Sequence, residues 1–134
     1  DGNCDRLQHY EMCLPAIALN KSIYTPEGTG GLGKVHIDKT YINISYNFMT
    51  PIDKDNTRYF WFQHRNTDPH DKDISEKMNA GAVMAFEEDR AVLEDVHLGM
   101  ENPATPNIDL GLDAGAKQFR MMLSRKIEEE QSSL

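Results

Sequence analysis

The sequence predicts an α+β fold, in which an antiparallel sheet from the first half of the chain packs against helices from the second half. In the first half, apolar and polar residues alternate, most clearly over residues 41–48, which is the period of a β-strand. From residue 74 onward, apolar residues recur every three or four positions, as they do on one side of a helix. A run of strands followed by helices is typical of α+β proteins.

Three β-like segments are expected before residue 66. The first covers residues 7–24, where Pro15 marks an edge position or a break. The second covers residues 34–49, and the third, residues 59–65, is aromatic and follows a turn at 51–56. This spacing predicts an antiparallel meander. Because three strands make a thin sheet, we expect upstream strands to complete it. In the second segment one face carries Ile42, Ile44, Tyr46 and Phe48, and the other carries Tyr41, Asn43, Ser45 and Asn47.

Two helices are expected in the second half of the chain. The first covers residues 74–100, and a loop with two prolines follows at 102–107. The second covers residues 114–129, with Asp113 as its N-cap. Its apolar stripe consists of Ala116, Phe119, Leu123 and Ile127.

Composition excludes several classes of partner. The 134 residues suffice for one domain or part of one, and 14 basic against 22 acidic residues give a net charge of −8. An acidic chain without a basic face is not expected to bind nucleic acid or an anionic membrane. Two cysteines, Cys4 and Cys13, cannot form a disulfide framework, so we expect a reducing, cytoplasmic location. Because the sequence has no initiator Met, we expect it to be the interior or the tail of a longer polypeptide.

Two motifs lack the context that their chemistry needs. The glycine-rich loop at 28–34 matches nucleotide-binding patterns, but a strand is predicted after it, and Val35 stands where a phosphate loop needs Ser or Thr. We therefore expect residues 28–33 to form a surface hairpin loop. His64 and His70 could be imagined as a metal pair, but they flank a proline-containing loop rather than sharing one helical face.

Asp89 is the residue whose type conflicts with its position. The helical period places it in the middle of the stripe that is expected to be buried. An ionised carboxylate there is costly unless something compensates it. The compensation could be a salt bridge to Arg58 or Arg65, a proton, or a metal ion. The stripe itself consists of Ile74, Met78, Ala82, Ala85, Phe86, Val92, Leu93 and Val96.

Several segments together resemble a known family. They are YNFMTP at 46–51, NTRYFWF at 56–62, AFEEDRAVLE at 85–94, and a closing pattern of Asp113, Arg120, Leu123 and Ile127. In this order and spacing, the chain resembles the C-terminal catalytic portion of Rieske-type non-haem iron oxygenases, on the branch of vanillate O-demethylase and dicamba monooxygenase. The resemblance covers roughly residues 35–130.

The resemblance implies a helix-grip, START-like catalytic domain, with one ferrous iron held by two histidines and one carboxylate. Asp89 matches the carboxylate ligand, and Asn47 matches a strand position with a substrate-contacting polar side chain. The family's Rieske [2Fe–2S] domain and its helix with the H-x4-H pair are absent, and we expect them upstream, so that residues 1–134 form the C-terminal part of one catalytic domain. By itself this piece is expected to be inactive.

The function implied is that of a terminal oxygenase, a mono- or dioxygenase that uses O₂ to hydroxylate or O-demethylate an aromatic or other hydrophobic compound. Electrons would come from NAD(P)H through a reductase, sometimes with a ferredoxin, and the family's head-to-tail arrangement implies a homotrimer. The competing interpretation is a helix-grip module that binds a hydrophobic ligand without chemistry. Asp89 discriminates between the two, because a pure binding module has no use for a carboxylate in its apolar stripe.

Overall fold

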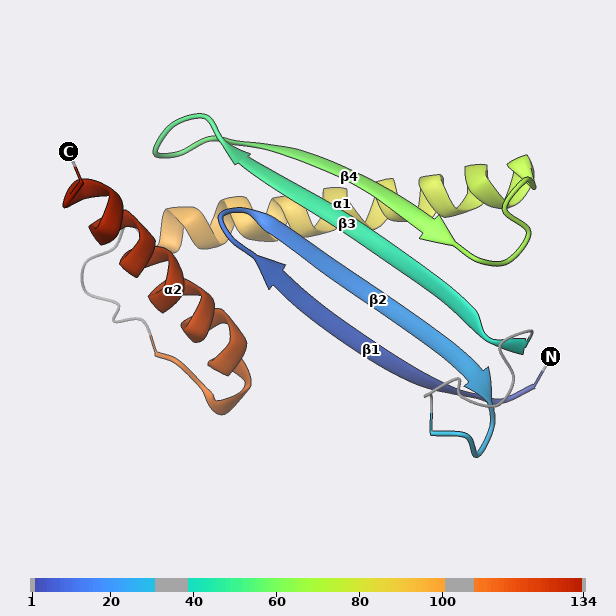
Figure 1. Ribbon diagram of the computed structural model, residues 1–134. Helices are drawn as coiled ribbons and strands as arrows, with labels where there is room; N and C mark the ends of the chain where they lie inside the picture. Colours follow the sequence, from blue (N-terminus) through green and yellow to red (C-terminus); the bar gives the residue numbers. More distant parts are fainter. Residues whose placement is uncertain (1, 31–38, 101–107, 134) are drawn as a thin grey trace. The chain divides into compact units, whose positions relative to one another are not determined.

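The computed structural model describes residues 2–30, 39–100 and 108–133 (Figure 1). The chain divides into two compact units. One comprises Asp1–Pro69 together with Gly115–Leu134, and the other comprises His70–Ala114. The first unit contains the sheet and nearly all of the C-terminal helix, and the second contains the long central helix. An antiparallel sheet with two helices confirms the predicted α+β class.

The sheet is a four-stranded meander, as the spacing of the strands predicted. The strands follow one another in the order β1-β2-β3-β4, and every neighbouring pair is antiparallel. Figure 1 shows the strands side by side, in the order of the sequence. Their bounds are β1 Cys4–Cys13, β2 Ile17–Pro26, β3 Tyr41–Pro51 and β4 Thr57–Arg65.

Pro15 marks a break, so the expectation of three strands was wrong and the sheet has four. The segment predicted over residues 7–24 is two strands joined by a tight turn at 14–16, where the Leu14–Pro15 peptide is cis. Cys13 pairs with Ile17 directly across this turn. Proline has no N–H to give to a sheet ladder, which is why the chain turns here instead of continuing as one strand.

The register sorts the side chains into two faces. In β3 the predicted alternation is confirmed, and cross-strand pairing extends it over the sheet. We call one face the apolar face; its members in the three last strands include Ile17, Leu19, Ile23, Ile42, Ile44, Tyr46, Phe48, Phe60, Phe62 and His64. We call the opposite face the polar face; its members include Asn20, Ser22, Asn43, Ser45, Asn47, Tyr59, Trp61 and Gln63, together with Gln8 and Tyr10 of β1.

Stacked rings join β3 and β4 on the apolar face. The ring centroid of Phe62 lies 4.8 Å from that of Tyr46 and 5.6 Å from that of Phe48, and both pairs are stacked. His64 lies 5.1 Å from Phe62 and 5.4 Å from Tyr46. Aromatic pairs at these separations stabilise beyond the area they bury, so Phe62 is the centre of this cluster.

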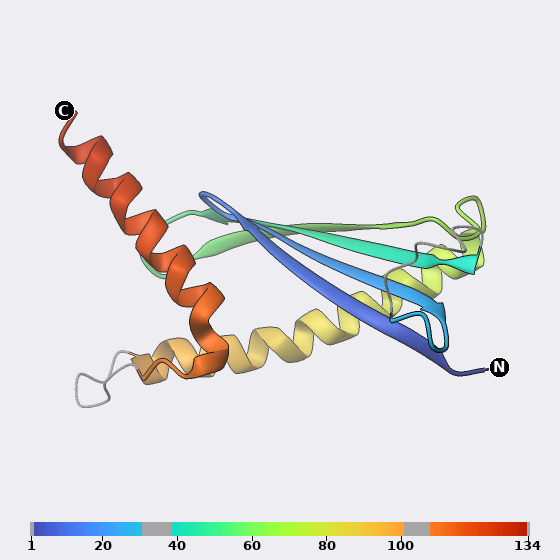
Figure 2. The ribbon, with the colours of Figure 1, turned by 60° about the horizontal axis from the view of Figure 1, so that its bottom comes forward.

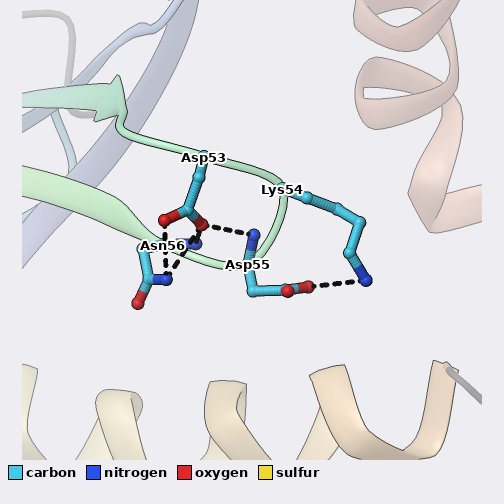
Figure 3. Close-up of polar contacts among 4 residues, drawn as sticks. All are labelled: Asp53, Lys54, Asp55 and Asn56. Atoms are coloured by element: carbon cyan, nitrogen blue, oxygen red, sulfur yellow. Dashed lines mark hydrogen bonds and ion pairs between the residues drawn. The ribbon is translucent and has the colours of Figure 1, made fainter.

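One carboxylate organises the turn between β3 and β4 (Figure 3). Asp53 Oδ1 accepts hydrogen bonds from the backbone N–H of Asp55 at 2.9 Å and from that of Asn56 at 2.8 Å, and the Asn56 side-chain amide donates to both carboxylate oxygens. These hydrogen bonds hold the pKa of Asp53 below its ordinary value, and the one from Asp55 N–H has the largest effect. The predicted turn at 51–56 is therefore confirmed, with Asp53 as its organising residue.

The glycine-rich segment joins two strands that pair with each other. Gly28 and Gly30 have φ of 83° and 73°, which glycine adopts without strain, and Gly30 N–H donates to Asp5 Oδ2 at 2.6 Å. The flanking strands β2 and β3 are antiparallel neighbours, so the parallel strand and helix of a nucleotide-binding motif are not the setting of this loop. The rest of the motif, residues 31–34, lies outside the described residues.

The long helix of the second unit is α1, Lys72–Met100, two residues longer at its start than predicted. Asp71 caps it by accepting a hydrogen bond from Ile74 N–H at 3.0 Å. Both views show one unbroken helix (Figures 1 and 2). Of the predicted stripe in the first half of the helix, Ala82 is buried and Ile74, Met78 and Phe86 are half-buried, whereas Ala85 is exposed.

A short 3₁₀ turn, η2 Gly111–Asp113, leads directly into the C-terminal helix α2, Ala114–Gln131. Asp113 precedes α2 as predicted, but its carboxylate accepts a hydrogen bond from Leu110 N–H at 2.8 Å and thus closes the 3₁₀ turn. Of the predicted stripe, Phe119 and Leu123 are half-buried, whereas Ala116 and Ile127 are exposed. The predicted loop at 102–107 lies outside the described residues.

Candidate functional site

Asn47 lies in the middle of β3, on the polar face, and it is half-buried. It stands opposite Ala18 of β2 and Trp61 of β4. Its Nδ2 donates to the carbonyl oxygen of Ala18 at 3.3 Å, and its Oδ1 accepts a hydrogen bond from the Tyr59 hydroxyl at 2.5 Å. The amide is therefore held by both neighbouring strands, which gives it a defined orientation on this face.

Tyr59 is the residue that the sequence analysis missed. It pairs with Met49, so it is the diagonal neighbour of Asn47 on the same face, within reach of a long side chain. The short turn after Pro51 sets this register, because Pro51 pairs with Thr57 and each later pair follows from it. The turn length was thus the signal that could have identified Tyr59.

Two further asparagines on the polar face have an unsatisfied acceptor. The Oδ1 atoms of Asn20 and Asn43 are buried and have no hydrogen-bond partner in the part of the chain that the structure describes. They stand on β2 and β3, where Asn20 pairs with Ser45 and Asn43 with Ser22. The middle of this face is therefore rich in amide and hydroxyl groups, which suits contact with a polar group rather than with an apolar core.

Asp89, the predicted metal ligand, lies on α1, and its side chain is exposed. The expectation that it sits in a buried stripe is wrong for this half of the helix, because Val92, Leu93 and Val96 are also exposed, at 62%, 66% and 50%. Helical period shows which residues share a side of a helix, but not what that side meets. The desolvation argument for a compensating cation at Asp89 therefore does not apply to the chain as described.

The Asp89 carboxylate makes no hydrogen bond or ion pair with any described residue. The adjacent cation, Arg90, is engaged elsewhere: its Nε donates to Glu94 Oε1 at 2.8 Å and its Nη1 lies 3.9 Å from Glu87. The hydrogen bond from Glu94 raises the pKa of Arg90. Asp89 thus offers a hard oxygen donor without a local competitor, which fits one ligand position of a ferrous ion.

The other candidate groups have local roles. Arg65 donates to the carbonyl oxygens of Thr67 and Asp68 at 2.9 and 2.8 Å, so its guanidinium is already engaged within the sheet unit. His64 belongs to the aromatic cluster of the apolar face, and His70 lies in the turn before α1. Among residues 2–30, 39–100 and 108–133, no three His, Cys, Asp or Glu side chains converge on a metal position.

A shallow hollow of about 190 Å³ lies on the apolar face, lined by His9, Glu11, Leu19, Lys21 and Ile44. Of the residues that line it, His9 Nε2 lies 3.3 Å from Glu11 Oε1, and both side chains are 57% exposed. Asn47 faces the other side of the sheet, so this hollow does not belong to the predicted site.

Within the described parts of the chain, no helix has both the length and the apolar character that crossing a bilayer requires.

Comparison with known proteins matches almost the whole chain. The family described as "Vanillate O-demethylase oxygenase C-terminal domain" matches residues 1–129. A putative toluene-4-sulfonate monooxygenase system iron-sulfur subunit of Comamonas testosteroni is 32% identical over 97% of the chain, and a second such subunit from the same organism is equally similar. A vanillate O-demethylase oxygenase subunit of a Pseudomonas species is 28% identical over 96% of the chain.

These matches cover only part of each relative. The chain spans 38% of the length of the two Comamonas proteins and 39% of the Pseudomonas protein. No solved structure matches the chain. The matched family bears the name of the branch that the segments at 46–51, 56–62 and 85–94 resembled, so the resemblance is confirmed.

Proposed function

The chain belongs to the family of vanillate O-demethylase oxygenase C-terminal domains, and on that premise we propose that it is the catalytic part of a Rieske-type terminal oxygenase. The full-length enzyme activates O₂ to hydroxylate or O-demethylate an aromatic or similar hydrophobic substrate. Two observations from the comparisons support this: the family is named for an oxygenase, and the relatives are named as monooxygenase and O-demethylase subunits.

Asp89 carries the proposal within this chain. We assign its exposed carboxylate, which has no partner among the described residues, as one ligand of a mononuclear Fe(II). Two histidines outside the described residues complete the ligand set in this proposal. When bound, a ferrous ion held by two histidines and one carboxylate would supply the activation of O₂. Asp89 fixes the charge of the site, because one carboxylate balances half of the charge of the ion.

Asn47 is the proposed substrate-binding residue. Its side chain is half-buried on the polar face, and the hydrogen bonds to Ala18 and Tyr59 hold its amide in place. A ligand seated on this face would meet amide and hydroxyl groups that can bind a substrate oxygen. A hydrogen-bonding site of this kind rejects an analogue that lacks the oxygen much more strongly than an apolar pocket does.

The proposed system has several further components. The names of the relatives include an iron-sulfur subunit of a monooxygenase system, which supports iron-sulfur chemistry in a multicomponent system. In the proposal, the cluster is a Rieske [2Fe–2S] cluster, and a separate reductase delivers electrons from NAD(P)H. A ferredoxin can stand between the reductase and the oxygenase. We further propose a homotrimer located in the cytoplasm, as the family resemblance and the two cysteines suggest.

The test is the iron content of an Asp89→Ala variant of the full-length enzyme. We expect the variant to lose the mononuclear iron and its O₂-dependent turnover, while the cluster iron and the folded state persist. Asp95→Ala is the matched control, because Asp95 is an exposed aspartate on the same helix. An Asp89→Ala enzyme with full iron content and activity would contradict the assignment. A parent enzyme without mononuclear iron would favour the alternative, a helix-grip module that only binds a hydrophobic ligand.

A further inference from the structure

The two hydrogen bonds of Asn47 fix which way its amide points. The Ala18 carbonyl oxygen can only accept, so the amide atom that faces it at 3.3 Å is Nδ2. The other amide atom, Oδ1, then faces the Tyr59 hydroxyl, and it can only accept. The Tyr59 hydroxyl must therefore donate its proton, and the short separation of 2.5 Å between the two oxygens fits a strong hydrogen bond.

This arrangement leaves Asn47 with a defined remaining capacity. One Nδ2 proton is directed to Ala18, and the second has no acceptor among the described residues. Oδ1 is engaged by Tyr59. The other two asparagines in the middle of the polar face differ, because the Oδ1 atoms of Asn20 and Asn43 have no partner in the described chain. The hydrogen bonds of Asn47 therefore fix it as a donor, whereas the Oδ1 atoms of the other two asparagines are held by no described residue.

We propose that Tyr59 is a positioning residue that makes Asn47 a hydrogen-bond donor, so that the site selects ligands with an acceptor oxygen such as a carboxylate or a sulfonate. The inference rests on the proposed function, in which Asn47 contacts the substrate. Without the Tyr59 hydroxyl, only the longer hydrogen bond of 3.3 Å to the Ala18 carbonyl holds the amide within the described chain, so its second Nδ2 proton is directed less firmly at an acceptor oxygen of the ligand. The hydroxyl thus acts on specificity through Asn47, without touching the ligand itself.

The test compares two probes that differ only in the acceptor group, toluene-4-sulfonate and toluene. Their Kd values are measured anaerobically on the full-length enzyme. We expect Tyr59→Phe to weaken sulfonate binding by roughly tenfold, the value of one hydrogen bond, and to leave toluene binding unchanged. A merely structural loss would weaken both probes alike, so the ratio of the two Kd values separates positioning from packing.

Tyr10→Phe is the matched control, because the Tyr10 hydroxyl also donates to a side-chain amide, that of Gln8, at 3.0 Å on the same face. It stands at the sheet edge and is 66% exposed, so we expect it to change neither Kd. Asn47→Asp, which turns the donor into an acceptor, should lose sulfonate binding by more than Tyr59→Phe does.

Equal effects of Tyr59→Phe on both probes, or no effect on the sulfonate, would overturn the inference. So would a parent enzyme that does not prefer the sulfonate to toluene. These outcomes are independent of the iron assay on Asp89, because binding is measured without O₂ and without turnover. A failure of the proposed oxygenase chemistry would thus appear as lost iron or activity with the binding ratio intact.

Discussion

Replacing Phe62 by alanine tests whether the ring cluster on the apolar face stabilises the sheet. Phe62 contacts three rings, those of Tyr46, Phe48 and His64, with centroids 4.8 to 5.6 Å away. A fully buried Phe→Ala substitution costs about 3–5 kcal/mol, and Phe62 is 42% exposed, so roughly half of that cost applies. We therefore expect Phe62→Ala to lower the free energy of unfolding by about 2 kcal/mol.

Urea denaturation followed by circular dichroism measures this change. Phe60→Ala is the matched control: Phe60 stands on the same face of the same strand, is 54% exposed, and stacks on no ring of the described chain. Its substitution should cost about 1 kcal/mol less than that of Phe62, the value of the lost ring pairs. If Phe60→Ala proves as destabilising as Phe62→Ala, the stacked rings do not contribute as argued.

Three further outcomes are expected. The hydrogen bonds to Asp53 lower its pKa, so they stabilise the turn above pH 3.8, and this stabilisation is lost as the pH falls through the lowered pKa. Asp53→Asn should therefore remove this acid step from a plot of unfolding free energy against pH. An unchanged step would show that it does not come from Asp53. In the full-length enzyme, Asn47→Leu should raise KM or uncouple O₂ consumption from product formation while iron content stays the same. If the variant and the parent have equal KM and coupling, Asn47 does not contact the substrate. The 134-residue chain alone should bind Fe(II) no tighter than roughly micromolar in anaerobic titration, because a single carboxylate gives no chelate, and tighter binding would reveal further ligands.

Much of the fold follows from local pattern. The alternation in β3 and the change to a helical period after residue 74 correctly predicted the meander and both helices. The strand count was wrong at Pro15, because a proline can lie at a sheet edge or end a strand, and only the pairing of Cys13 with Ile17 decides between them. Asp113 was placed correctly next to α2, but its hydrogen bond goes back to Leu110.

The candidate site was less predictable, because it depends on what each face meets. Periodicity grouped Asp89 with Val92 and Leu93, but all three are exposed in the described chain, so the burial inferred from it was wrong. Its proposed role as a metal ligand stays a prediction that rests on the family pattern. The hydrogen bond between Tyr59 and Asn47 depends on the register of β3 and β4. The length of the turn between the two strands sets this register, and the residue types alone do not.

The meander has connections of very unequal length, and this determines the order in which its hairpins close. β1 and β2 are joined by residues 14–16 and β3 and β4 by residues 52–56, whereas β2 and β3 are separated by residues 27–40. Closing that longer connection costs about 1 kcal/mol more in chain entropy than closing the β3–β4 turn. The two outer hairpins should therefore form early, and their docking along β2 and β3 should limit the refolding rate. Because the β3–β4 hairpin is then already formed when docking limits the rate, substitutions in the Asp53 turn are expected to slow refolding more than they speed unfolding, and lengthening the segment 27–40 should also slow refolding.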